Sequence, residues 1–229
     1  MLPIDHIYII NLDHRTDRWD TIQKLVHNLF STEGNSRWSR FSGIIPDLQV
    51  VSESCYNRFT INPKVKKDKE RVHNYLTGAT GCKMSHVEII RDAKSKGYKQ
   101  ILILEDDACL PPNLSVAQFR KDLHEALLEL QVRNWWMCYL GGKNVGEVYP
   151  SGRKIARING IKTTHAYLIH ERCFDLVLQG MMNSGLEADV FYQWIHTQCR
   201  CFRITPGILI QSEDYSDILG QNVNYKKIV

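Results

Sequence analysis

A short aliphatic run that ends in three consecutive acids constrains this chain more than any other feature. Residues 101–104 read Ile-Leu-Ile-Leu, and Glu105, Asp106 and Asp107 follow directly. An unbroken aliphatic run of this length is typical of a central strand that is covered on both faces. Acidic triplets are most often solvated loops. Here, however, the acids follow a buried strand, and the carboxyl edge of an α/β sheet is where such folds bind ligands.

The alternation of side chains along a strand gives the three acids different directions. Glu105 and Asp107 should share one face of the strand, and Asp106 should point to the other. Adjacent carboxylates repel one another unless a cation or hydrogen-bond donors hold them. The triplet therefore predicts a cation or a set of donors at this strand end.

The overall composition excludes some classes of partner. Of 229 residues, 43% are hydrophobic and 24% are charged, which is ordinary for a soluble globular protein. The net charge of +4 is far below the basic excess of a nucleic-acid binder, so we expect no nucleic-acid partner. Basic residues do concentrate in residues 64–71. Acids are mixed among them, which favours a solvated loop or helix face over a phosphate contact.

The cysteines and the apolar runs bear on the compartment. Seven cysteines without framework spacing indicate reduced thiols. Cys199 and Cys201 alone would make a poor zinc site, and alternation along a strand explains the pair better. No basic segment followed by a long apolar core opens the sequence, and no run approaches the length of a membrane span. We therefore expect a cytoplasmic protein with no membrane span.

Segments of strand and helix character alternate along the chain. Short β-branched and aromatic runs predict strands, and apolar positions at helical spacing predict helices. Residues 146–157 are typical of a hairpin or loop. The alternation indicates an α/β fold with a mostly parallel sheet. We expect strands at residues 7–10, 38–45, 101–104, 135–140, 166–169, 201–204 and 208–210, and helices at residues 19–30, 84–93, 114–132, 172–182 and 187–195.

The same pattern is compatible with one domain that spans residues 1–229. Residues 46–77 have a weak, polar pattern, which predicts a long loop that leaves the sheet. Loops of that length usually carry function or are disordered. A C-terminal tail should begin at about residue 212.

Two segments before predicted helices hold candidate ligands for a phosphate. Arg15 and Arg18 follow the first predicted strand, near the helix start at Trp19. Arginines beside exposed helix amides suit a diphosphate, although on this segment alone a pair of surface arginines is about as frequent.

The second segment contains Gly78 and Gly81, which precede the next predicted helix. Glycines there would let the backbone approach a ligand closely, and the helix start would supply free N–H groups. Ser85 and His86 follow and could both contact a nucleotide, although a single histidine more often has a structural role.

Together, these motifs resemble those of glycosyltransferase family 25, which includes lipopolysaccharide galactosyltransferases and collagen galactosyltransferases. The motifs stand in the family's order and cover nearly the whole chain. The resemblance is carried by residues 7–18, 78–86, 103–108, 140–142 and 164–169, by Asp189, and by residues 206–218.

The resemblance implies a GT-A fold, a Rossmann-like nucleotide-diphospho-sugar transferase domain with a mixed, mostly parallel sheet. It also implies inverting transfer of a hexose, galactose or glucose, from a UDP-sugar to a hydroxyl of a glycan or protein acceptor. Mn²⁺, or Mg²⁺, would assist, with Asp107 as the main ligand and Glu105 beside it. Glu105 replaces the aspartate that is common at this position in GT-A enzymes. We expect the donor to be bound by Asn11, Leu12, Arg15, Arg18, Gly81, Ser85, His86 and Asp106.

An inverting reaction also needs a base that takes the proton of the acceptor hydroxyl. Asp189 is our candidate, because it begins a helix in a region that would face the acceptor. A helix cap is an equally good explanation of this residue, and Asp214 and Asp217 are rival bases. For His165, a hydrogen bond in the core is the better explanation.

Two other function classes compete with a transferase. A catalytically weak or inactive relative would bind a nucleotide sugar without turnover, but the intact acidic triplet and the arginine pair argue against it. A phosphotransferase is the other alternative, and the sequence lacks its glycine-rich phosphate loop.

Overall fold

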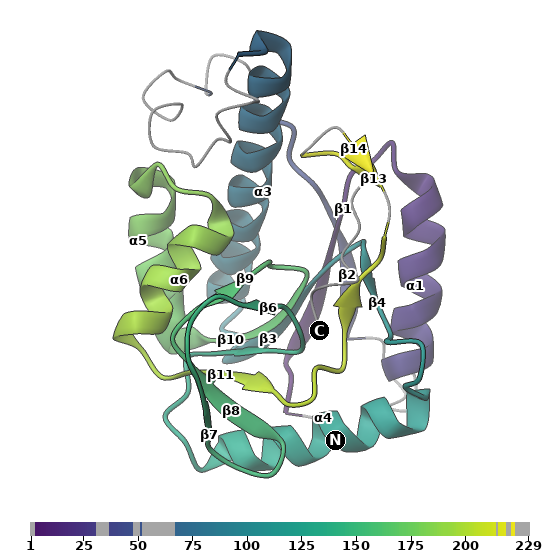
Figure 1. Ribbon diagram of the computed structural model, residues 1–229, viewed down its shortest axis with the longest axis vertical. Coiled ribbons are helices and arrows are strands. Elements are labelled where there is room, and N and C mark those ends of the chain that lie inside the picture. The colour runs from purple at the N-terminus through teal and green to yellow at the C-terminus, as the bar shows by residue number, and fades with distance from the viewer. Residues whose placement is uncertain are drawn as a thin grey trace.

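An eight-stranded mixed sheet forms the centre of the computed structural model (Figure 1). The structure describes residues 3–30, 37–47, 51, 67–213, 215–218 and 221–222. The strand order is β2-β1-β3-β10-β5-β11-β8-β7. The strands are β1 (His6–Asn11), β2 (Trp38–Ser42), β3 (Gln100–Glu105), β5 (Met137–Tyr139), β7 (Val148–Pro150), β8 (Ile155–Ile158), β10 (Ala166–His170) and β11 (Cys201–Ile204).

The sheet is mostly parallel in direction. β1 runs parallel to β2 and β3, and β5 runs parallel to β11. β10 lies antiparallel between β3 and β5, so these two strands share a direction. β8 is antiparallel to both β11 and β7. Only β10 and β8 are therefore reversed within this sheet, which confirms the predicted α/β fold with a mixed, mostly parallel sheet.

Helices cover both faces of the sheet, as the unbroken aliphatic run predicts. Leu102 and Leu104 pack in one hydrophobic cluster with residues of α1 and α4, whereas Ile101 and Ile103 pack in a second with α3, α5 and α6. All four side chains are at most 1% exposed. The helices are α1 (Thr16–Phe30), α3 (Lys69–Ser95), α4 (Val116–Gln131), α5 (Phe174–Ser184), preceded by the 3-10 turn η2 (Glu171–Cys173), and α6 (Ala188–Gln198).

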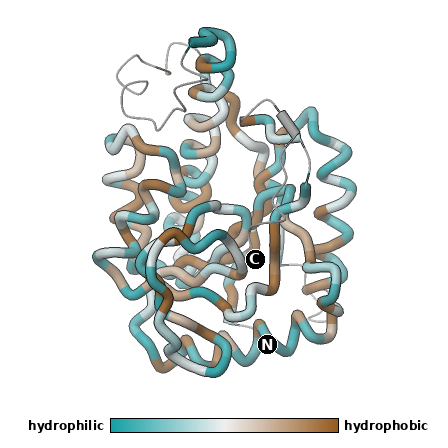
Figure 2. Tube along the Cα trace, viewed as in Figure 1, coloured by the Kyte–Doolittle hydropathy of each residue, from teal (hydrophilic) through white to brown (hydrophobic). Residues whose placement is uncertain are grey.

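The hydropathy of the chain follows this layering. Figure 2 shows hydrophobic residues along the central strands, whereas hydrophobic and hydrophilic residues alternate along α1. In α1 the buried residues are Ile22, Val26 and Leu29, at the spacing of one helix face. Among the described helices, none combines the length and apolar character that crossing a bilayer requires.

Three short strand pairs lie outside the main sheet. β4 (Ala108–Cys109) pairs with β12 (Ile210–Gln211), which fixes the chain just after the acidic triplet. β6 (Lys143–Asn144) pairs with β9 (Ile161–Lys162), and β13 (Tyr215–Ser216) pairs with β14 (Gln221–Asn222). The segment predicted as a tail from about residue 212 therefore contains a strand pair. Of the two predictions for residues 146–157, a hairpin or a loop, the antiparallel pair of β7 and β8 shows the hairpin.

The predicted loop over residues 46–77 is wrong at its C-terminal end, because α3 begins at Lys69. Asp68 caps the helix by accepting a hydrogen bond from the backbone N–H of Arg71 at 3.2 Å. Val72, Leu76 and Ala79 then form a small buried cluster. Residues 48–50 and 52–66 of the predicted loop lie outside the described residues.

Candidate functional site

A cavity of about 380 Å³ opens at the carboxyl ends of β1 and β3. Its size falls in the range of small-molecule sites. The loop after β1, residues 43–46 after β2 and one face of α3 form much of its wall, and residues 215–218 close it from the C-terminal side. All three acids, Glu105, Asp106 and Asp107, line it. The acids therefore lie at the carboxyl edge of the sheet, as expected, and that edge opens into a cavity.

Each acid has a different set of partners. Glu105 accepts a hydrogen bond from Thr164 and lies 3.2 Å from His86 Nε2. Asp106 accepts from Asn11 Nδ2 at 2.8 Å and from Arg18 at 3.0 Å. The predicted alternation of faces does not extend beyond Glu105, because β3 ends there and the next two acids form a turn.

Asp107 is the least satisfied of the three. Its Oδ2 accepts a hydrogen bond from Gln211 Nε2 at 3.1 Å. Its Oδ1 is buried and has no hydrogen-bond partner among the described residues. A buried oxygen left without a donor is destabilising, and a bound cation would satisfy it.

The acids also perturb one another's ionisation. Burial, together with the charges of Glu105 and Asp106, raises the pKa of Asp107 to about 8. Burial likewise raises the pKa of Asp106, although Asn11 and Arg18 oppose the shift. Burial would also raise the pKa of Glu105, but hydrogen bonds from His86 and Thr164 outweigh it and hold that pKa below its ordinary value.

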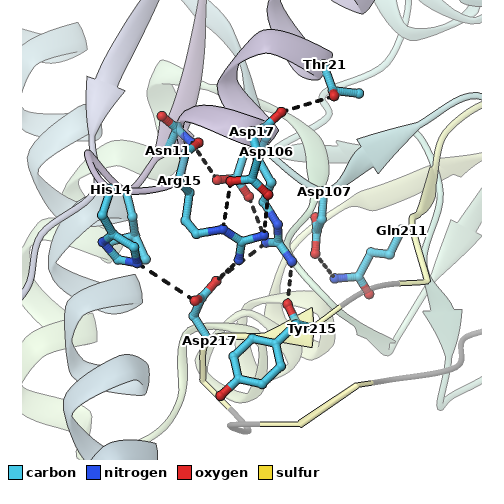
Figure 3. A network of polar contacts seen from close by, with 12 residues as sticks. Asn11, His14, Arg15, Asp17, Thr21, Asp106, Asp107, Gln211, Tyr215 and Asp217 are labelled. Carbon is cyan, nitrogen blue, oxygen red and sulfur yellow. Dashed lines mark hydrogen bonds and ion pairs between the residues drawn. The ribbon is translucent and has the colours of Figure 1, made fainter.

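The two arginines of the first loop join distant parts of the chain. Arg18 lines the cavity and donates to Asp106 and to the carbonyl of Tyr215. Arg15 is not among the lining residues, and it donates to Asp217 at 2.6 Å and to both oxygens of Asp17. Figure 3 shows Arg15, Asp106 and Asp217 in one network of polar contacts. The arginines therefore hold the C-terminal segment against the acidic strand end.

The remaining residues predicted from the first loop also reach the cavity. Asn11 and Leu12 both line it. Asn11 is 1% exposed, donates to the carbonyl of Arg15 at 3.0 Å and accepts from Arg40 Nε at 2.9 Å. Asn11 thus fixes the shape of the loop as well as the orientation of Asp106.

The predicted glycine turn before a helix is wrong, because Gly78 and Gly81 lie inside α3. A Cβ atom on Gly81 would lie 2.2 Å from the carbonyl oxygen of Ile44, so glycine permits the loop after β2 to approach the helix. Ser85 Oγ accepts from the N–H of Ile44 at 2.9 Å and donates to the Gly81 carbonyl at 2.8 Å. Gly81 and Ser85 both line the cavity, and their contacts with Ile44 also hold the loop after β2, which forms another part of the wall.

Buried aromatic side chains orient His86 on the cavity wall. Its Nδ1 lies 2.8 Å from the hydroxyl of Tyr167, which in turn lies 2.8 Å from the hydroxyl of Tyr192. His86 itself is fully buried. The side chain expected to contact a nucleotide therefore also connects Glu105 to the core.

The candidate bases occupy different places. Asp189 lies in the first turn of α6 and accepts from the N–H of Thr163 at 3.4 Å, but it is not among the lining residues. The N-cap of α6 is Glu187, so Asp189 does not occupy the cap position. Burial raises the pKa of Asp189. Asp217 lines the cavity, whereas Asp214 lies outside the described residues.

Three residues at the site lie within the motifs named above but were given no individual role there. Thr164 and Gln211 bind the acids, and Cys82 lines the cavity beside His86. The four-residue spacing of Cys82 and His86 was a usable signal, because it places both on one helix face. His165 is buried, with Nδ1 3.1 Å from Thr163 Oγ1, as expected of a core histidine.

The fold defines an α/β protein with an acid-lined cavity at the carboxyl edge of its sheet, the edge where such folds bind their ligands. The sequence model of glycosyltransferase family 25, described as LPS biosynthesis protein, matches residues 4–191. The match covers most of the chain, so this protein belongs to glycosyltransferase family 25.

Solved structures give distant likenesses. A UDP-glucose pyrophosphorylase complexed with UDP-glucose shows 10% identity and a TM-score of 0.47, with 91% of this chain and 92% of that chain covered. A mannose-1-phosphate geranyltransferase from Thermus thermophilus shows 11% identity and a TM-score of 0.41, with 95% and 76% covered. No curated protein matches the chain. The family and the cavity, rather than these likenesses, bear on function.

Proposed function

We propose that this protein is an inverting glycosyltransferase that transfers galactose or glucose from a UDP-sugar to a hydroxyl of a glycan or protein acceptor. Membership of glycosyltransferase family 25 supports the reaction class. The observation that carries the proposal is the acidic strand end, where three carboxylates line one cavity and Asp107 Oδ1 is buried without a partner among the described residues.

The acids fit a divalent cation. Asp107 and Glu105 offer carboxylate oxygens, which Mn²⁺ and Mg²⁺ prefer as ligands. We assign Asp107 as the main ligand, because its unpaired oxygen gains most from a cation, and we place Glu105 beside it. When bound, the cation would neutralise negative charge on the departing diphosphate.

The donor would lie between the first loop and α3. Arg18 presents a guanidinium to the cavity, where it can pair with a phosphate, and Arg15 adds positive charge behind it. Asp106 is held by Asn11 and Arg18, which leaves it as an acceptor for the ribose or for a water. Leu12, Gly81, Ser85 and His86 complete the donor site that we propose.

Asp189 remains our candidate for the base. Burial raises its pKa, and a carboxylate with a raised pKa is a better proton acceptor than an ordinary one. Burial raises the pKa of Cys82, which lines the cavity, and the charges of Glu105 and Asp189 add to this shift. Asp217 is the rival, but its Oδ2 already accepts a hydrogen bond from Arg15 at 2.6 Å.

Turnover of UDP-galactose and UDP-glucose, measured as UDP release with and without Mn²⁺, tests the proposal. We expect release with one of these donors, stimulated by Mn²⁺ and lost in Asp107→Asn. If calorimetry shows that the donor binds but no acceptor leads to UDP release, the protein is a non-catalytic relative that binds nucleotide sugars. Absence of both binding and release with either donor would overturn the proposal.

A further inference from the structure

Three side chains that can bind a transition metal meet on the wall of the cavity. They are Cys82, His86 and Glu105, and their candidate ligand atoms lie within 4.8 Å of one another. Cys82 and His86 are four residues apart on α3, so both project from one helix face. Glu105 reaches them from the end of β3. Two rigid elements of the fold, rather than loops, therefore position the cluster.

The surroundings orient the cluster as the outer shell of a metal site does. Metal-binding histidines usually donate their second ring N–H to a neighbouring acceptor, which fixes the tautomer. Here Nδ1 of His86 lies 2.8 Å from the hydroxyl of Tyr167, and Nε2 points toward Glu105 at 3.2 Å. In the metal-bound form, the Nδ1 proton of His86 would be donated to Tyr167, and the lone pair of Nε2 would face the cluster in place of the hydrogen bond from Nε2 to Glu105.

The acidic member of the cluster is held in the same way. Thr164 donates a hydrogen bond to Oε1 of Glu105, which fixes the carboxylate and leaves Oε2 for another contact. All three cluster residues line the cavity, so a cation can enter and a water can reach it. The cluster thus has three ligands, an oriented outer shell and an entry path, which are the features expected of an open metal site.

We propose that Cys82, His86 and Glu105 form a binding site for a thiophilic divalent cation such as Zn²⁺, with the fourth position open to the cavity. Thiolate and imidazole ligands select Zn²⁺, whereas carboxylates and waters suit Mn²⁺ and Mg²⁺. This site is therefore distinct in chemistry from the oxygen-ligand site at Asp107. The two share Glu105, so they compete for it. Cation binding here does not depend on the transferase reaction and is measurable without turnover.

Cobalt spectroscopy and zinc calorimetry on the full chain test the site. Co²⁺ in the wild-type protein should give a thiolate-to-cobalt charge-transfer absorption, and Zn²⁺ should abolish it. Calorimetry should show that Cys82→Ser weakens Zn²⁺ binding by at least about tenfold. Loss of a residue that only supports a metal ligand already lowers metal affinity by about that factor, and Cys82 would be a ligand itself. Cys109→Ser is the matched control, because Cys109 is also partly buried and lies outside the cluster. It should leave the affinity unchanged.

Three results would overturn the proposal. The first is the absence of the charge-transfer absorption when Co²⁺ is added to the wild-type protein. This measurement does not depend on the folding of any variant. The second is Zn²⁺ affinity that stays the same in Cys82→Ser and in Cys82→Ala, with circular dichroism showing both folded. Equal losses in Cys82→Ser and Cys109→Ser would also contradict it, because binding would then not depend on the cluster.

Discussion

Replacement of Asp107 by asparagine should stabilise the protein in the absence of metal and abolish its response to manganese. The carboxyl of Asp107 is surrounded by two other acids, and one of its oxygens is buried without a partner among the described residues. Asparagine has nearly the same shape and can still accept the hydrogen bond that Gln211 donates. The substitution therefore removes a destabilising charge while it preserves the packing.

The size of the expected stability change follows from the pKa of Asp107. Burial and the neighbouring carboxylates raise this pKa from 3.8 to about 8, so the folded state keeps a proton that the unfolded chain releases. This contribution to stability is fully present below about pH 4 and is lost as the pH rises to about 8. Between about pH 5 and pH 8 the wild type should lose roughly 2–4 kcal/mol that the variant does not lose, because one pKa unit corresponds to ~1.4 kcal/mol.

Chemical denaturation of both proteins in a chelator, at about pH 5 and about pH 8, measures this difference. In a thermal melt, each 1 kcal/mol corresponds to roughly 2–4 °C for a chain of this size. Addition of Mn²⁺ should raise the melting temperature of the wild type and leave that of Asp107→Asn unchanged. Asp20→Asn, at an exposed carboxylate of α1, is the control and should behave as the wild type in every condition.

Two outcomes would refute this reasoning. A variant less stable than the wild type at about pH 8 would mean that the Asp107 carboxylate is well solvated or paired in the folded state. An equal Mn²⁺-induced stabilisation of both proteins would place the cation away from Asp107.

Three further predictions address the rest of the site. Arg18→Ala should weaken UDP binding in calorimetry by about tenfold or more, because hydrogen bonds to charged groups contribute ~1.5–3 kcal/mol; unchanged binding would mean that this arginine serves only Asp106 and the C-terminal segment. Asp189→Asn should leave donor binding intact and lower transfer by roughly 10²–10⁴-fold, whereas the same loss in Asp217→Asn alone would move the base to the C-terminal segment. Gly81→Ala should destabilise the fold by about 1–3 kcal/mol in denaturation, because its Cβ would lie 2.2 Å from a carbonyl oxygen. Gly78→Ala, where the nearest contact would be 3.0 Å, should have a smaller effect, and equal effects would rule out the clash as the cause.

The local sequence was sufficient to predict the centre of the fold. The run at residues 101–104 is buried on both faces of the sheet because it is apolar at every position, whatever packs against it. The strand, loop and helix at residues 6–30 follow from adjacent patterns in the same way. The position of the acids at the sheet edge follows from the end of that strand, so the place of the cavity was also predictable.

The boundaries and partners of the site depended on tertiary contacts. The N-terminal turns of α3 have a weak pattern, and Val72 and Leu76 are buried in a cluster against Val51 and Ile218, which lie far away in the sequence. Gly81 resembles a turn residue in the sequence, but it lies inside α3, where the lack of a side chain lets the loop carrying Ile44 pack against the helix. The hydrophobic pattern of the local sequence does not indicate such packing.

The sequence by itself determined the sheet, its buried central strand and the place where three carboxylates meet. Only the tertiary structure decided which carboxylate oxygen lacks a partner among the described residues, because the donors come from remote segments: Thr164 and His86 for Glu105, and Gln211 for one oxygen of Asp107. Hydrophobic periodicity is a local property of the chain, whereas hydrogen-bond satisfaction and pKa depend on neighbours that only folding brings together.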